Sequence, residues 1–173
     1  ALPWTVGLLL VTTLLSWIIG NISGGLSGYF TGSRLLKILD GTVMFVRPIP
    51  YYVLGLMLVI LFAYLLPVFP FGGGYTIGAR IVFSWSFVRD VLKHAFLPAL
   101  SLSLLGVAVN HQTMQLIIQG VKEEDYIRYA KIGAVKERTI FARYAMRNAI
   151  LPQITGLTLS LGQIFGGALI TEI

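Results

Sequence analysis

The residues that could take part in chemistry are concentrated in one segment of the sequence, 122–147. This segment holds seven basic and four acidic side chains, more than half of the 20 charged residues in a chain of 173. Charged residues make up only 12% of the chain, against about a quarter in an ordinary soluble domain. The segment is therefore the first candidate for a binding site built on ion pairs and hydrogen bonds.

Motifs for catalysis and metal binding are absent from the sequence. His94 and Asp90 lie close together, but the chain has no His-Glu-x-x-His and no Gly-x-Ser-x-Gly pattern. The glycine run 72–74 lacks the Gly-Lys-Ser/Thr of a phosphate loop. There is no cysteine, so a thiolate metal site is excluded. We expect no catalytic residue, no metal site and no cofactor bound by this chain.

A few polar residues and prolines interrupt the apolar parts of the chain. Irregular backbone at membrane depth is tolerated where protein or a water-filled cavity covers it, and polar groups at that depth often line a path. An ordinary proline kink and a histidine satisfied by its neighbours are the simpler interpretations. The candidate pathway residues are Pro48, Pro50, Asn110, His111 and Gln153.

Four uncharged windows decide the fold class, because each is longer than the roughly 20 apolar residues that cross a bilayer. The windows cover 1–33, 48–79, 94–121 and 148–171. They predict an all-α fold, a polytopic transmembrane helical bundle in the lipid bilayer, with a polar connection at 34–40 and a third helix that opens with a kink at Pro98. The four predicted transmembrane helices lie within 2–29, 42–66, 92–119 and 149–170.

The first predicted helix carries a glycine at every fourth position of its second half. This spacing places the glycines on one face, where another helix can approach closely. We expect this face to pack inside the bundle. It consists of Gly20, Gly24, Gly28 and Gly32.

The basic residues predict the orientation of the chain. Ten lysines and arginines share the side of the 122–147 segment and three lie opposite, so the rule that Lys and Arg stay inside makes this segment cytoplasmic. Both chain ends then lie outside, which suggests that flanking helices are missing and that 1–173 is part of a permease-like membrane domain. The ten include Arg34, Lys37 and Arg47, and the three are Arg80, Arg89 and Lys93.

Periodicity predicts two short amphipathic helices in the charged segment. Asp125 is suited to cap the first helix, and Gly133 is suited to end it with a positive φ. A second helix around 140–145 precedes Pro152, which we expect in the first turn of the last membrane helix. Such helices could lie on anionic lipid or dock on a soluble partner. One face of the first helix is formed by Tyr126, Ala130 and Gly133.

The stretch EDYIRYAKIGAVKERTIFARYAMRNAILP, 124–152, resembles the EAA-type cytoplasmic loop of ABC importer permeases. Its ending RNAILP is similar to the dipeptide and oligopeptide group, of the type of the first of two paired permease subunits. The glycine of this family usually sits one place after Gly133, where this chain has Ala134. Further similar stretches follow in the family's order: RPIPYYVLGLMLVILFA from Arg47, LPALSLSLLG from Leu97 and LPQITGLTLSLGQIFGGALITEI from Leu151.

The resemblance implies a function and a set of partners. The chain would form the translocation path of an ATP-driven importer for peptides, or for oligosaccharides, delivered by an extracytoplasmic substrate-binding protein. A second permease subunit, identical or different, would complete the path, and two separate ATPase subunits would use ATP and Mg²⁺. No nucleic acid is expected. The loop would act as a coupling helix docked on an ATPase through Glu124, Asp125, Tyr126, Arg128, Tyr129, Ala130, Lys131, Gly133 and Ala134.

Other classes of protein are compatible with parts of the sequence. A secondary transporter or a channel would need acidic residues within the membrane or a filter motif, and an intramembrane enzyme would need one of the absent motifs. A membrane scaffold without transport is allowed by the amphipathic loop alone. Neighbouring genes for two ATPases, a second permease and a lipoprotein binding protein would separate the importer from these classes.

The predicted orientation can be tested by cysteine labelling. Single cysteines in place of Glu137 and Ser84 should be reached from opposite sides of the membrane, because the two positions flank the third predicted helix and its following segment. The measurement is labelling by an impermeant thiol reagent in intact and in permeabilised cells. Labelling of both positions in intact cells would rule out this topology.

Overall fold

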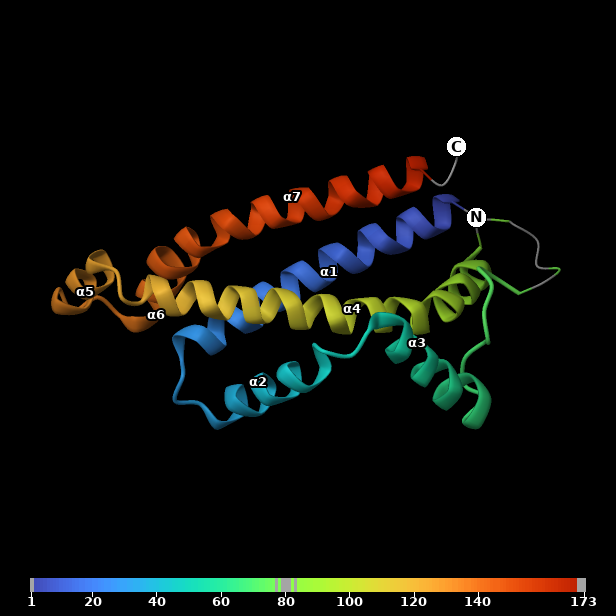
Figure 1. The fold of residues 1–173 in the computed structure, drawn as a ribbon, viewed down its shortest axis with the longest axis horizontal. Helices are drawn as coiled ribbons and strands as arrows, with labels where there is room; N and C mark the ends of the chain where they lie inside the picture. Colours follow the sequence, from blue (N-terminus) through green and yellow to red (C-terminus); the bar gives the residue numbers. More distant parts are fainter. Residues whose placement is uncertain (1, 77, 79–81, 83, 171–173) are drawn as a thin grey trace.

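Three long helices form the body of the protein (Figure 1). The computed structural model describes residues 2–76, 78, 82 and 84–170, so Arg80 of the predicted outer basic residues lies outside the described part. Helices α1 (Leu2–Tyr29), α4 (Trp85–Val121) and α7 (Met146–Ile170) pack pairwise against one another. Their length along one common direction gives the molecule an elongated shape, with the start of α1 and the end of α7 near the same end (Figure 1).

The predicted class, an all-α membrane bundle, is confirmed, and the number of spans differs from the prediction. In the described residues, two helices are long and apolar enough to cross a membrane, α1 over Trp4–Tyr29 and α4. A bent pair of helices adds a third span if it is counted as one. The fourth predicted span is helical within α7, but α7 is not among the helices that meet the length and hydropathy requirement.

The second predicted helix, expected over 42–66, is divided in two at the proline kink that the sequence indicates. Helix α2 (Arg34–Val46) begins within the expected polar connection, and α3 (Tyr51–Val59) follows after a break, continued by the π-helical segment η1 (Ile60–Leu65). The two parts are bent by 98°. Pro48 and Pro50 explain the break, since a proline donates no backbone hydrogen bond and restricts the residue before it.

The third predicted helix begins seven residues earlier than expected, at Trp85 instead of position 92. The hydroxyl oxygen of Ser84 accepts a hydrogen bond from the Phe87 backbone N–H at 3.3 Å, so Ser84 caps the helix. Pro98 consequently lies inside α4, and not at its opening. The Ser101 hydroxyl donates to the Pro98 carbonyl at 2.9 Å.

The charged segment contains one separate short helix, α5 (Asp125–Ile132), where the sequence predicts two. The second is continuous with the last long helix: α6 (Glu137–Thr139) runs into the π-helical segment η2 (Ile140–Ala145) and then into α7. Pro152 therefore lies inside α7 and not in its first turn.

Three of the four predicted glycines hold α1 against α4. A Cβ atom added at Gly24 would lie 2.1 Å from the backbone oxygen of His111, and one at Gly28 would lie 2.7 Å from the oxygen of Gln115. One at Gly20 would lie 2.5 Å from the Asn110 Cβ. The two backbones thus approach closely along this face. Gly32 departs from the expectation, because it follows the end of α1 and has no atom within 4 Å of an added Cβ.

We predict that Gly24→Ala destabilises the bundle, by about 1–3 kcal/mol or more, because the new methyl group overlaps backbone atoms that cannot rotate away. The matched control is Gly7→Ala in the same helix, where nothing lies within 4 Å of the added Cβ. The measurement is the thermal unfolding midpoint of the purified protein in detergent. Equal midpoints for the two variants would show that α1 and α4 are farther apart than the structure places them.

Candidate functional site

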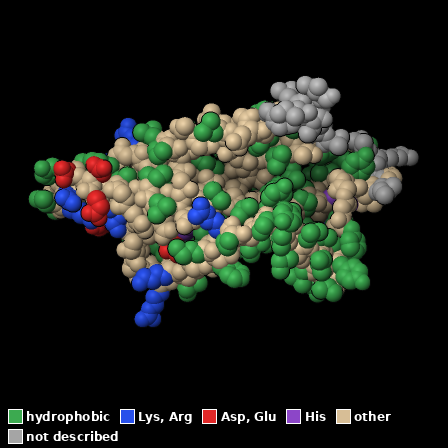
Figure 2. All heavy atoms as spheres, viewed as in Figure 1, with side chains coloured by type: hydrophobic (Ala, Val, Ile, Leu, Met, Phe, Trp, Pro, Cys, Tyr) green, Lys and Arg blue, Asp and Glu red, His purple; other side chains and the backbone are tan. Residues whose placement is uncertain are grey.

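The charged end of the molecule is built on a compact apolar cluster. Figure 2 shows acidic and basic side chains gathered at the end that carries α5. Beneath them Ile127 is fully buried and Ala130 is 9% exposed. Both pack with residues from the ends of α1, α4, η2 and α7, so α5 is attached to the bundle as a rigid projection. The cluster consists of Tyr29, Met114, Ile118, Ile127, Ala130, Ile140, Ala145 and Ala149.

Helix α5 ends in a Schellman motif whose left-handed residue is Ala134. The Val135 backbone N–H donates to the Ala130 oxygen at 3.1 Å, and the Ala134 N–H donates to the Lys131 oxygen at 3.0 Å. Ala134 has φ +54°, while Gly133 has φ −75°. The expectation of a positive φ at Gly133 is thus wrong by one residue. The left-handed position is the one at which the resembling family usually has its glycine.

The start of α5 also differs from the prediction. Asp125 is the first helical residue, and Glu124 occupies the capping position without a side-chain hydrogen bond to the helix. The Asp125 carboxylate lies 3.7 Å from the Arg128 guanidinium, which is also 3.6 Å from Glu123. These side chains are largely exposed, so the ion pairs stabilise little and leave Arg128 available to other groups.

The exposed face of α5 carries two large side chains. Tyr129 is 71% exposed and Ile132 is 80% exposed. Tyr126 is less available, because Asn148 Nδ2 donates to its hydroxyl at 3.2 Å. The predicted docking face consists of Tyr126, Ala130 and Gly133. Ala130 packs into this chain's own core, so only part of this face is available to a partner. The remaining predicted docking residues Glu124, Asp125, Arg128, Lys131, Gly133 and Ala134 are exposed.

Contacts at the end of α1 tie the charged end together. The Tyr29 hydroxyl donates to the Glu137 carboxylate, and Lys122 Nζ donates to the Tyr29 backbone oxygen at 3.0 Å. The rings of Tyr29, Phe30 and Phe141 lie with centroids 4.9–5.4 Å apart. Glu137 therefore links the charged end of the molecule to the end of α1.

A polar cluster lies deeper in the bundle and joins α1, α2 and α4. The Asp40 carboxylate accepts hydrogen bonds from Gln115 Nε2 at 3.0 Å and from the Ser27 hydroxyl. His111 Nε2 lies 2.9 Å from the same carboxylate, and its Nδ1 lies 2.9 Å from the Ser23 hydroxyl. A carboxylate only accepts, so Nε2 of His111 is the donor. His111 is 0% exposed, and three donors satisfy the acid beside it.

The predicted pathway residues are scattered and do not form one surface. His111 is buried in the Asp40 cluster, and Gln153 is 5% exposed. Asn110 donates to the Gly106 oxygen of its own helix at 2.8 Å. Pro48 and Pro50 are exposed at the break between α2 and α3. The simpler interpretation of His111 as a histidine satisfied by its neighbours fits these contacts.

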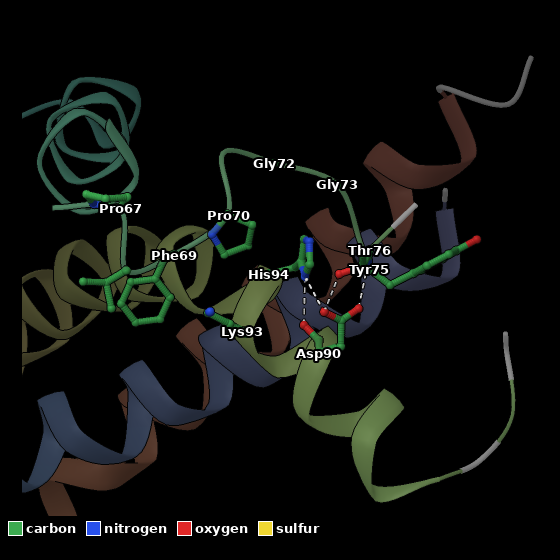
Figure 3. Close-up of a pocket in the computed structure, with 11 residues that line it drawn as sticks. Pro67, Phe69, Pro70, Gly72, Gly73, Tyr75, Thr76, Asp90, Lys93 and His94 are labelled. Atoms are coloured by element: carbon green, nitrogen blue, oxygen red, sulfur yellow. Dashed lines mark hydrogen bonds and ion pairs between the residues drawn. The ribbon is translucent and has the colours of Figure 1, made fainter. Parts of the chain in front are cut away.

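A cavity of about 740 Å³ lies at the end opposite α5, between the 67–76 segment and the start of α4 (Figure 3). Asp90 accepts two hydrogen bonds from Thr76, one from the backbone N–H and one from the hydroxyl, each at 2.7 Å. His94 Nδ1 lies 2.9 Å from the Asp90 backbone oxygen. Asp90 thus fastens the loop to α4 through Thr76, while His94 contacts Asp90 within the same helix. Other lining residues include Pro67, Phe69, Pro70, Tyr75 and Lys93.

Sequence reasoning missed two residues that determine these sites. Ile127 is the buried anchor of α5, and its spacing of three residues from Ala130 could have identified a shared inner face. Asp40 was placed in a polar connection between helices. Asp40 lies three residues before the buried Val43, and this spacing could have identified Asp40 as a residue on the inner face of α2.

The chain belongs to the family of binding-protein-dependent transport system inner membrane components, whose model matches residues 14–173. It is therefore a membrane protein of a transport family, and not a member of an enzyme family. The recognition of an importer permease from the loop sequence is confirmed by this match.

Curated relatives extend the similarity along nearly the whole chain. It is 30% identical over 171 residues to the oligopeptide transport system permease protein AppB of Bacillus subtilis, covering 99% of this chain and 52% of the relative. It is 28% identical to the probable D,D-dipeptide transport system permease protein DdpB of Escherichia coli, covering 98% and 54%. The same values describe the di/tripeptide transport system permease protein DppB of Pseudomonas aeruginosa. The chain spans about half the length of these relatives.

We predict that Ala134→Gly stabilises the protein by about 1 kcal/mol. Relief of the left-handed conformation is worth about 1–2 kcal/mol, and the greater freedom of glycine in the unfolded chain offsets about 0.4–1 kcal/mol of it. Gly133→Ala is the matched control, since an added Cβ there meets its nearest atoms at 3.4 and 3.7 Å and φ is negative. Thermal unfolding in detergent measures both. A lower midpoint for Ala134→Gly than for the wild type would contradict the assigned turn.

Proposed function

We propose that this chain is a permease subunit of an ATP-driven importer that carries peptides across the membrane. The choice of peptides rests on the relatives, since the names of AppB, DdpB and DppB refer to oligopeptides, D,D-dipeptides and di/tripeptides. Oligosaccharide, the alternative from the sequence, has no support among these names. The path would be completed by a second permease subunit.

The observation that carries the coupling part of the proposal is the exposed face of α5. Tyr129 and Ile132 project from a helix that Ile127 fastens to the bundle. Large side chains on a rigid support supply contact area at low entropic cost, which suits docking on a soluble protein. On a purely lipid-bound helix Ile127 and Ala130 would face the membrane, whereas here both are buried against this chain.

The docking partner is proposed to be one of two ATPase subunits, with α5 on the cytoplasmic side. Arg128 and Lys131 flank the exposed side chains and would orient the helix in a cleft. A push on α5 would act on the ends of α1, α4 and α7, because all three contribute to the cluster beneath it. The opposite end, with the cavity near Asp90, would then face the outside and the substrate-binding protein.

A secondary transporter is the second class to consider, because Asp40 and His111 form an acid–histidine pair inside the bundle. In this pair the carboxylate is already held by Ser27 and Gln115 as well as by His111. Such a fully matched acid fastens helices together, and a proton relay would need an open position for the arriving proton. The importer remains the function that we propose.

We predict that the double variant Tyr129→Ala, Ile132→Ala loses copurification of the ATPase subunits while its own unfolding midpoint stays within a few degrees of the wild type. Both side chains are exposed, so their removal takes away contact area without leaving a cavity. Tyr64→Ala is the control, because Tyr64 is 70% exposed at a distance from α5.

Peptide uptake into proteoliposomes and ATPase activity should be measured on the same preparations. Ala130→Trp is expected to act differently, by lowering stability, since Ala130 lies in the buried cluster. Undiminished copurification in the double variant would remove α5 as the docking helix.

A further inference from the structure

The cavity beside the 67–76 segment has a polar side and an apolar side. The polar side belongs to α4, where Asp90, Lys93 and His94 line the cavity within one helical turn. The apolar side belongs to the 67–76 segment, which contributes two prolines and Phe69 (Figure 3). The volume of about 740 Å³ is within the range of roughly 300–1,000 Å³ that is typical of small-molecule sites. The cavity therefore suits a small ligand with both charged and apolar groups.

Two contacts hold the 67–76 segment against α4 and so define the width of the cavity. At one end of the segment, Thr76 donates two hydrogen bonds to the Asp90 carboxylate, each at 2.7 Å. Near the other end, the Phe69 ring stacks on Phe96 of α4 with centroids 4.7 Å apart and planes at 6°. The cavity thus exists without a ligand, and a preformed site binds without the cost of ordering a loop.

His94 contributes a buried ring nitrogen that has no partner among the described residues. The side chain is only 8% exposed, and its Nδ1 lies 2.9 Å from the Asp90 backbone oxygen. A carbonyl oxygen only accepts, so Nδ1 carries the hydrogen, and Nε2 of the neutral ring is left as an acceptor. Figure 3 shows the ring directed from α4 toward Gly72 and Gly73. A Cβ added at Gly73 would lie 3.9 Å from His94 Cδ2, so the glycine leaves this side of the ring open.

The charges of the cavity lie in two separate places. The Asp90 carboxylate is next to His94, and each of its oxygens accepts one hydrogen bond from Thr76 and keeps a further lone pair. The Lys93 ammonium lies on the side of Phe69, away from the His94 ring (Figure 3). Lys93 is in none of the ion pairs of the described residues. The cavity thus offers acceptors at one place and a cation at another.

We propose that this cavity binds a short peptide as a zwitterion, with the peptide ammonium at His94 Nε2 and Asp90 and the peptide carboxylate at Lys93. This inference rests on the proposed function as a peptide permease. An ammonium has three donors for these acceptors, and the Lys93 charge repels a simple amine that lacks a carboxylate. The side chains of the peptide would contact Phe69 and the prolines, which fit varied apolar groups. The site therefore recognises the two ends that linear peptides share.

The test measures peptide binding to the complete importer in detergent without its substrate-binding protein, so that binding to that protein plays no part. The probe is radiolabelled alanylphenylalanine in equilibrium dialysis, and the competitors are its N-acetyl form and its C-terminal amide. We expect each blocked form to bind the wild type about tenfold more weakly than the free dipeptide, the effect of one charge-assisted hydrogen bond.

Two variants assign the two ends of the peptide to their residues. His94→Leu removes the Nε2 acceptor, so it should weaken the free dipeptide about tenfold and abolish the effect of acetylation. Lys93→Gln should abolish the effect of amidation and keep that of acetylation. Arg89→Gln is the control, since Arg89 is exposed on the same helix and does not line the cavity. Copurification of the partner subunits reports assembly, and the exposed Lys93 carries the test if His94→Leu does not assemble.

The outcomes separate this proposal from the proposed function. Peptide uptake by wild-type proteoliposomes with the binding protein present tests the function itself. With uptake intact, the site would be overturned if the wild type bound no dipeptide or bound the free and blocked forms equally. It would also be overturned if Lys93→Gln still distinguished the acid from the amide, or if a variant weakened all three ligands by the same factor, as a change in the shape of the cavity would. Absence of uptake by the wild type would refute the peptide importer and this site together.

Discussion

The close approach of α1 to α4 at Gly24 is the constraint on which the other contacts of the bundle depend. The backbone of His111 lies where a Cβ of residue 24 would be, so only glycine allows this separation. At this separation the ring of His111 reaches Ser23 on α1 and Asp40 on α2. The hydrogen bonds of the polar cluster form because the helices are close, with His111 fully buried and the Asp40 side chain still 22% exposed. A bulkier residue at position 24 would therefore disturb the polar cluster together with the helix pair.

One face of α4 connects this contact to the charged end. His111, Met114 and Ile118 recur at intervals of three and four residues and are all fully buried. His111 meets the Asp40 cluster, while Met114 and Ile118 belong to the apolar cluster that holds Ile127 of α5. Close-packed interiors deform little, so a displacement of α5 is carried to this face mainly as a rigid movement. The arrangement connects α5, the proposed docking helix, to α2 through one continuous face of α4.

The parts of the fold that could be predicted from the sequence are those set by local composition and period. Long uncharged windows predict apolar helices, and the four-residue glycine period identifies the α1 face that meets α4 at Gly20, Gly24 and Gly28. The role of Asp40 depends on three helices converging, which no local pattern records. The residue with positive φ is Ala134 and not Gly133. The Schellman hydrogen bonds start at the Ala130 oxygen, and the position of Ala130 is set by its packing in the core. The packing of a buried residue determined the turn here, and the preference of glycine for positive φ did not.

Helix α2 shows how polar contacts replace apolar packing in this protein. Its large apolar side chains, including Leu35, Ile38 and Phe45, are exposed at 70–76%. In lipid such side chains gain nothing by turning inward, because hydrocarbon surrounds them on either side. The orientation of α2 is then set by Asp40, which would be left with an unmatched charge in any other rotation of the helix.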